Sequence, residues 1–158
     1  MSAKLAVHGG MPIQPVPLNP YISIGAEEKA AVDRVMATGS LSGFVACDDD
    51  RFYGGHEVRS FEKYFAELLG APYAVSFNSA SSGLVAAVTA LGVGIGDEVI
   101  VPALGVVMDA YVAIHQGATP IFVDVDKETH GMDISDLEKK ITNKTKAIIT
   151  VSLQGLSV

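Results

Sequence analysis

The stretch GDEVIVPALGVVMDAYVAIHQGATPIFV, residues 96–123, decides the fold class. It contains a short apolar run at Glu98–Val101, a helical segment over Val106–Gln116 that Gly117 ends, and a second apolar run at Pro120–Val123. A strand, a helix and another strand joined by short connections are typical of a parallel βαβ unit. Apolar runs without polar alternation, here VIV at Val99–Val101 and IIT at Ile148–Thr150, are expected to form strands buried on both faces of the sheet.

The same alternation continues on either side of this stretch. A β-prone run at Tyr73–Phe77 and a small-residue helical segment at Ser79–Leu91 precede it, and a helix over Ile134–Ile141 and a strand over Ala147–Val151 follow it. The series predicts an α/β fold of three layers, αβα, around a mostly parallel sheet. Residues 152–158, SLQGLSV, end before any helix that could cover the last strand, so the sheet is expected to be incomplete in this chain.

The N-terminal residues have a different character. Residues 1–24 are expected to form an extended arm, because prolines disfavour helix along them; these prolines are Pro12, Pro15, Pro17 and Pro20. Helices are predicted over Glu27–Thr38 and from Glu57 to Gly70, with an irregular loop between them at Ser40–Gly55. The expected organisation is therefore the arm followed by a single domain part over residues 25–158.

Composition and charge argue against several kinds of partner. The 158 residues are 49% hydrophobic and 18% charged, which is enough apolar material for one core. The net charge of −7 disfavours nucleic acid or an anionic membrane surface as partner. Neither a spanning apolar run nor a signal peptide is present, so a cytoplasmic location is expected. Cys47 is the only cysteine and the four histidines lack metal-ligand spacing, so no metal site is predicted.

One segment has the character of an anion site. FNSASSG, residues 77–83, joins an expected strand to a helix of small residues, at the edge where parallel sheets bind ligands. Ser79 or Ser81 can cap the helix, and the backbone N–H groups of its first turn can face a phosphate. The alternative is that the serines only cap the helix, since neither G-x-G-x-x-G nor a P-loop lysine occurs here.

From these residues onward the chain resembles a known family. NSASSGLVAAVTALG, at Asn78–Gly92, is similar to the NSGTAAL…ALG stretch of the DegT/DnrJ/EryC1/StrS sugar aminotransferases. Further matching stretches occur in the expected order: GSLSG at Gly39–Gly43, GGHEVRSFEKYFAELLGA at Gly54–Ala71, GDEVIVP at Gly96–Pro102, GATPIFVDVD at Gly117–Asp126 and TKAIITV at Thr145–Val151. The resemblance implies the aspartate aminotransferase fold, with this chain as the N-terminal part of the large pyridoxal-phosphate (PLP) binding domain of a fold-type I enzyme.

The resemblance also implies cofactor-binding residues. The phosphate-binding Gly-Thr-Ala of the family falls on Ala80, Ser81 and Ser82, so the Ser81 hydroxyl and the amides of Ser81 and Ser82 are expected to bind phosphate. The family's aromatic residue over the pyridine ring corresponds to Val106, which offers dispersion but no π-face; the alternative is a plain core valine. Ser152 replaces the histidine of the family's His-x-x-Gly.

The function that the resemblance implies belongs to a longer protein. It is transfer of an amino group from an amino acid, commonly glutamate, to a keto-sugar nucleotide by a homodimer. The family's ring-nitrogen aspartate and Schiff-base lysine are expected beyond Val158, so no catalytic residue is assigned within residues 1–158 and this chain alone is expected to be inactive. The lysines of the last predicted helix and of the loop after it are expected at the surface: Lys139, Lys140, Lys144 and Lys146. A sugar dehydratase of the same family and a non-catalytic α/β module are the alternatives.

Overall fold

The chain divides into two compact units, Met1–Ser60 and Phe61–Val158. The computed structural model describes residues 4–14, 16 and 19–156. Within those residues, each helix is too short or too polar to cross a lipid bilayer. Each unit is described by itself, beginning with the second, which contains the sheet.

A parallel sheet of three strands in the order β2-β1-β3 is the centre of the second unit. The strands are β1 (Glu98–Pro102), β2 (Thr119–Val123) and β3 (Thr145–Ile148). Ile100 of β1 is in register with Ile121 on one side and Ile148 on the other. The side chains of β1 from Val99 to Val101 are completely buried, because helices lie against both faces of this middle strand.

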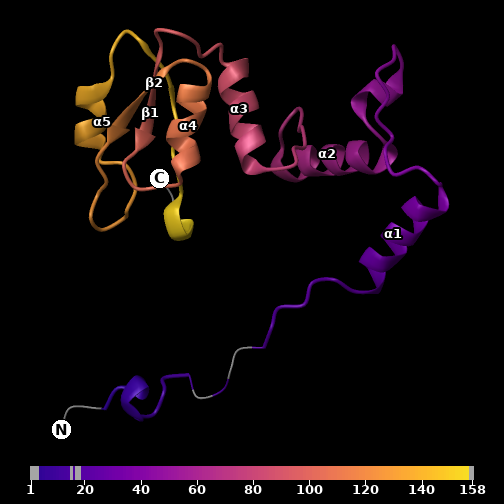
Figure 1. Ribbon diagram of the computed structural model, residues 1–158, viewed down its shortest axis with the longest axis horizontal. Helices are drawn as coiled ribbons and strands as arrows, with labels where there is room; N and C mark the ends of the chain where they lie inside the picture. Colours follow the sequence, from indigo (N-terminus) through magenta and orange to yellow (C-terminus); the bar gives the residue numbers. More distant parts are fainter. Residues whose placement is uncertain (1–3, 15, 17–18, 157–158) are drawn as a thin grey trace. The chain divides into compact units, whose positions relative to one another are not determined.

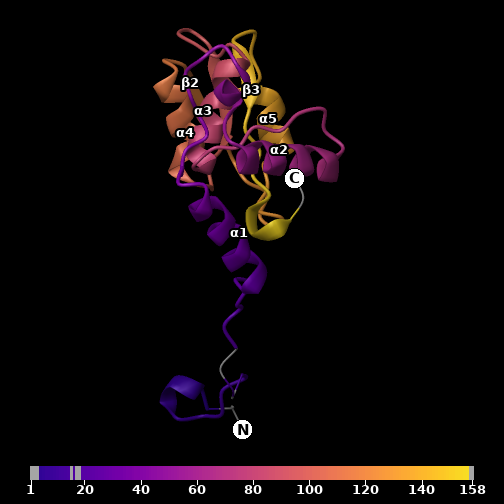
Figure 2. The ribbon, with the colours of Figure 1, turned by 90° about the vertical axis from the view of Figure 1, so that its right-hand side faces the viewer.

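The sheet lies between two helix layers, as the sequence predicts (Figures 1 and 2). Helices α3 (Ala80–Ala90) and α4 (Val107–His115) contact one face. Their apolar side chains form one buried cluster with the sheet; its members include Val88, Val93, Val99, Val101, Val112, Ala113, Ala118 and Ile149. Helix α5 (Ile134–Lys140) contacts the other face, where Ile100, Val123 and Met132 form a second cluster. The αβα prediction is therefore confirmed.

The connections fix the direction of the two helices on the first face. Both α3 and α4 are joined to β1 by short loops and run antiparallel to it (Figure 1). At their C-terminal ends the Gln116 side-chain amide donates a 2.8 Å hydrogen bond to the Thr89 hydroxyl. The N-termini of both helices therefore lie at the carboxyl end of β1, the edge at which open α/β sheets bind ligands.

The first unit consists of an arm, a helix, a loop and the start of a second helix, which continues into the second unit. In the arm, Ala6–His8 form a short 3₁₀ turn, and two of the prolines invoked for its extended conformation, Pro15 and Pro17, lie outside the described residues. Helix α1 spans Ala26–Ala37 and α2 spans His56–Leu69, each within a residue or two of its prediction. The loop between them is not wholly irregular: a 3₁₀ turn forms at Asp50–Tyr53, because the Asp49 carboxylate accepts the Arg51 N–H.

Two glycine motifs of this loop meet in space. A side-chain carbon built on Gly43, at the end of GSLSG, would overlap the backbone of Gly55. A side-chain carbon built on Gly55 would lie 3.2 Å from the Cα of Gly43, which is closer than an ordinary contact. Glycine at position 43 therefore lets the beginning and end of the loop approach so closely, and a side chain at position 55 would require a small shift of the backbone at Gly43.

Two strand predictions are corrected. Tyr73–Phe77 is not a strand: no described strand lies beside it, and the Ser76 N–H and hydroxyl both bond to the Glu62 carboxylate of α2. The last strand is Thr145–Ile148 and not Ala147–Val151. Its register shifts between Glu98 and Val99, so pairing begins two residues earlier than the apolar pattern indicates and ends sooner. The apolar pattern reports burial, whereas strand limits depend on which backbone groups find partners.

Candidate functional site

The N-terminus of α3 is organised by a network of polar side chains. Ser79 is the N-cap, and its hydroxyl accepts a 3.1 Å hydrogen bond from the Ser82 N–H. The Ser82 hydroxyl in turn donates to the Asn78 side-chain oxygen at 2.7 Å and lies 3.0 Å from the Ser79 hydroxyl oxygen. Of the two serines that could cap this helix, Ser79 therefore does so. Asn78, which the sequence did not single out, orients the cap.

The groups at this helix end that remain open to a ligand come from two residues. The N–H groups of Ala80 and Ser81 and the Ser81 hydroxyl have no hydrogen-bond partner among the described residues. The Ser82 N–H, also expected to face an anion, is instead bonded to Ser79. The first turn of α3 contains no acidic residue, so the positive end of the helix dipole is not neutralised locally. Small side chains and open N–H groups at a helix N-terminus suit a phosphate.

Val106 lies at the N-terminus of α4, as Ser79 does at the N-terminus of α3. It is the N-cap residue, with extended backbone angles, and its side chain is 65% exposed. Val106 therefore belongs to neither buried cluster described above. Its N–H donates to the Asp109 carboxylate at 3.2 Å. Sequence reasoning missed Asp109, although an acid three residues after a helix boundary is a known capping signal.

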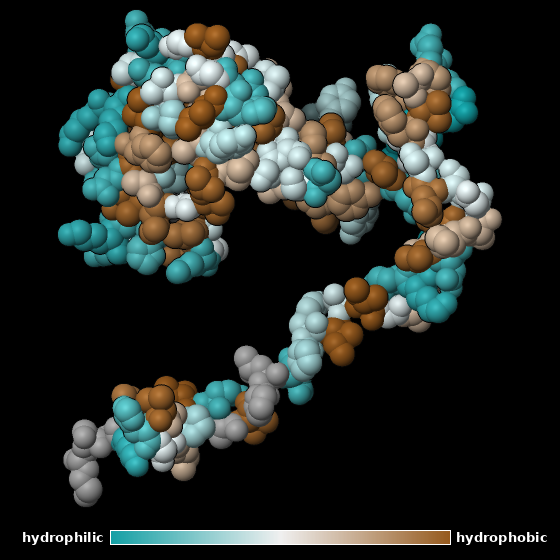
Figure 3. Space-filling view, in the orientation of Figure 1, coloured by the Kyte–Doolittle hydropathy of each residue, from teal (hydrophilic) through white to brown (hydrophobic). Residues whose placement is uncertain are grey.

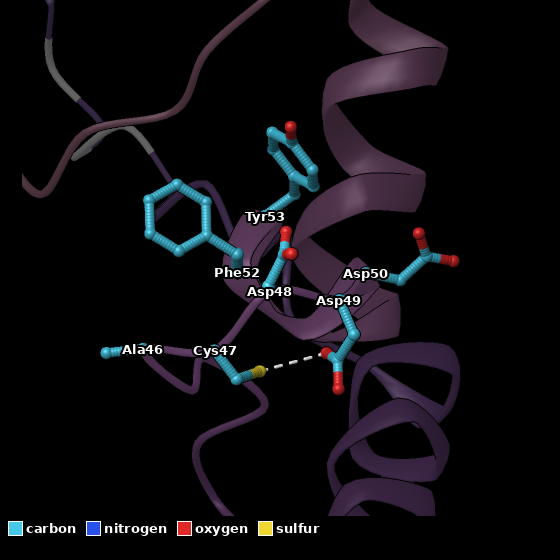
Figure 4. A pocket seen from close by; sticks show the side chains of 7 residues that line it. All are labelled: Ala46, Cys47, Asp48, Asp49, Asp50, Phe52 and Tyr53. Carbon is cyan, nitrogen blue, oxygen red and sulfur yellow. Dashed lines mark hydrogen bonds between the residues drawn. The ribbon is translucent and has the colours of Figure 1, made fainter.

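The loop of the first unit contains a hollow of about 750 Å³ (Figure 4). Its lining consists of Ala46, Cys47, Asp48, Asp49, Asp50, Phe52 and Tyr53. The Cys47 thiol donates to the Asp49 carboxylate at 3.0 Å, and Arg51 forms an ion pair with the same carboxylate at 2.6 Å. The hydrogen bonds from Arg51 hold the pKa of Asp49 well below its usual range.

The chemistry of this hollow does not suit a nucleophile. The carboxylate of Asp49 raises the pKa of the Cys47 thiol, because a thiolate beside it would be repelled. The thiol therefore stays protonated near neutral pH, and a protonated thiol is a poor nucleophile. Cys47 thus acts as a small polar residue of the loop.

The remaining residues weighed from the sequence have simple environments. The Lys140 ammonium bonds to the Asp136 carboxylate at 2.7 Å and to the Phe122 carbonyl at 2.6 Å. The side chains of Lys139, Lys144 and Lys146 are exposed, as expected. Ser152 is exposed a few residues after β3 and begins a 3₁₀ turn at Leu153–Gly155.

Comparison with known proteins shows the family to which the chain belongs. A model of the DegT/DnrJ/EryC1/StrS aminotransferase family matches residues 28–158. The chain belongs to this family. GDP-perosamine synthase of Escherichia coli O157:H7 is 48% identical to it over 101 residues, which are 64% of this chain and 28% of the relative. The spore coat polysaccharide biosynthesis protein SpsC of Bacillus subtilis is 40% identical over 134 residues, 85% of this chain and 32% of the relative.

A solved structure of similar sequence has the same fold. A protein from Streptococcus pneumoniae, described as a candidate sugar aminotransferase, superposes with a TM-score of 0.73 and 34% identity in its PMP form, over 90% of this chain and 33% of its own. The same protein has also been solved in a PLP form, with a TM-score of 0.71. The three strands and their helices thus belong to the fold of PLP aminotransferases, and this chain spans about a third of the length of the relatives it matches.

Proposed function

We propose that the complete protein is a PLP-dependent aminotransferase that transfers the amino group of an amino acid, glutamate, to a keto-sugar linked to a nucleotide. The observation that carries this proposal is the family match over residues 28–158, in a chain whose α3 and α4 both begin at the carboxyl end of β1. Relatives named for GDP-sugar and UDP-sugar chemistry support a nucleotide-sugar substrate.

The residues at the start of α3 fit the phosphate of the cofactor. Ala80 and Ser81 offer backbone N–H groups, the Ser81 hydroxyl offers a further donor, and no acidic side chain opposes an anion in the first turn of the helix. Ser82 contributes through its link to Ser79 and Asn78, which holds the turn in place. The exposed Val106 side chain supplies an apolar surface for a ring by dispersion.

When bound, PLP accepts the amino group and serves as the electron sink of the reaction. The part of the work that falls to this chain is to bind the phosphate and to orient the ring. The lysine and the aspartate of the reaction are proposed to lie on residues after position 158 of the complete protein. No residue of this chain is assigned a proton-transfer role.

We also propose that the complete protein is a cytoplasmic homodimer. Helix α2 exposes one large apolar side chain after another along its second half (Figure 3): Phe61, Tyr64, Phe65, Leu68 and Leu69, each at least 41% exposed. Apolar surface of this extent is typical of faces that are covered in the assembled protein. Its burial by further domains and by a second subunit is consistent with such an assembly.

The test uses the complete protein, purified without added cofactor. Titration with PLP should restore a visible absorption band. Incubation with glutamate and a panel of GDP- and UDP-linked keto-sugars should yield 2-oxoglutarate and an amino sugar in equal amounts. Release of water from the sugar without amino transfer would instead identify a dehydratase. Failure to bind PLP would favour the non-catalytic module and overturn the proposal.

A further inference from the structure

Asp109 is an unusual acid for its place in the fold. Its side chain is 7% exposed, and no other charged side chain among the described residues is buried to that degree. No lysine, arginine or histidine of the described chain forms an ion pair with it. A carboxylate in such a place is costly unless hydrogen bonds or a helix dipole compensate its charge.

The compensation comes from the start of α4. The Asp109 carboxylate accepts the Val106 N–H at 3.2 Å, and the Asp109 N–H donates to the Val106 carbonyl at 3.0 Å. The carboxylate therefore lies at the positive end of the helix and is joined to Val106 through both backbone polar groups of that residue. The position of Val106 thus depends directly on the Asp109 side chain.

Gly105 is the spatial complement of this carboxylate. A side-chain carbon built on Gly105 would lie 2.7 Å from the Asp109 carboxylate oxygen, closer than real carbons approach. The next atom, the ring carbon Cγ of Pro102, would be at an ordinary 3.5 Å. The carboxylate fills the space beside Gly105, so a side chain at position 105 requires the carboxylate to move aside.

A comparison within the chain separates this arrangement from a plain helix cap. Asp133 caps α5 by accepting the Ser135 N–H at 2.8 Å, yet its side chain is only half-buried and lies by the opposite face of the sheet. Capping alone therefore does not require burial. At α4 the capped residue is also the exposed Val106, at the edge of the sheet where α3 begins.

We propose that Asp109 is a positioning residue, paired with Gly105, that fixes Val106 at the place where the cofactor ring is held. The inference rests on the proposed function, because the place of Val106 beside the cofactor ring is part of that proposal. Removing the carboxylate frees the Val106 N–H and lets Ala103–Val106 relax. An alanine at position 105 displaces the carboxylate and has the same result by a different route.

The experiment measures PLP binding to the complete protein and three variants: Asp109→Ala, Gly105→Ala and the double variant. Each single change should raise the dissociation constant of PLP about tenfold, on the expectation that the free energy lost with one such cap is lost from cofactor binding. It should also alter the visible circular dichroism of the bound cofactor. The double variant should bind no more weakly than Asp109→Ala alone, because the added methyl occupies the vacated space. Asp109→Asn, which keeps an acceptor oxygen, should retain most of the affinity.

Asp133→Ala is the matched control. It removes a cap of the same chemistry and should lower the melting temperature of the apoprotein while leaving the dissociation constant of PLP and the dichroism unchanged. Wild-type dissociation constant and dichroism in Asp109→Ala would overturn the positioning role alone. Additive losses in the double variant would also overturn it, since the two residues would then act independently. Absence of PLP binding by the wild type would overturn the proposed function and this inference together.

Discussion

Replacing Ser81 with aspartate puts a carboxylate in the first turn of α3, where its effects on folding and on cofactor binding have opposite signs. In the apoprotein the new charge lies at the positive end of a helix without other acids in its first turn, and should stabilise it by roughly 0.3–1 kcal/mol. In the holoprotein the same charge faces the phosphate. Two unit charges about 4 Å apart at an effective dielectric constant near 20 repel by ~4 kcal/mol.

That repulsion corresponds to a loss of about a thousandfold in PLP affinity, since ~1.4 kcal/mol is a factor of ten. Ser81→Ala removes only the hydroxyl donor and should weaken binding by about ten- to a hundredfold, as expected for a hydrogen bond to a charged group. Fluorescence titration of the complete apoprotein with PLP measures both values. Thermal melting of the same samples without cofactor measures the stabilisation.

Ser135→Asp is the control for this pair, because Ser135 is the second residue of α5 as Ser81 is the second residue of α3. It adds the same charge at the same helical position against the other face of the sheet. Its PLP affinity should equal that of the wild type. Unchanged affinity in Ser81→Asp, or an equal loss in Ser135→Asp, would refute the assignment of the phosphate to α3.

Three further predictions concern the ring contact, the acid sensitivity and the isolated chain. Val106→Phe should hold or strengthen PLP binding in the complete protein, because the exposed side chain gains a π-face; weaker PLP binding would contradict this. The pKa of Asp136 is lowered by the Asp124 N–H and by Lys140, so its contribution to stability is present above the unfolded pKa, near 4, and is lost as pH falls through the folded pKa. Asp136→Asn should therefore lower the urea midpoint at pH 7, and its difference from the wild type should shrink as pH falls below about 4. The isolated chain 1–158 should bind a hydrophobic dye, aggregate on size-exclusion chromatography and show no amino transfer, because α2 exposes its apolar face; a monodisperse, dye-free chain would count against it.

The sequence by itself determined the layered α/β fold and the start of the helix at the candidate site. The apolar run at Val99–Val101 predicted a strand buried on both faces, and β1 is one. The same prediction for Ile148–Thr150 is wrong, because β3 is an edge strand of the sheet and leaves Ile148 42% exposed. The helical periods predicted the helices that cover β1. Serines after an expected strand located the helix end at residues 79–82, since capping depends on a few neighbouring residues. Such features depend on residues close together in the chain, so they can be recognised in a single sequence.

Tertiary structure decided what depends on partners distant in the chain. Tyr73–Phe77 has the composition of a strand, yet strand formation requires a neighbouring backbone, and its described hydrogen bonds go to Glu62 of α2. The limits of β3 followed from its register against β1, not from its apolar residues. The burial of Asp109 and the space reserved for it beside Gly105 were invisible in sequence, because an acid three residues after a helix boundary is equally compatible with an exposed cap. Burial is decided by how the elements pack, and packing exists only in the folded chain.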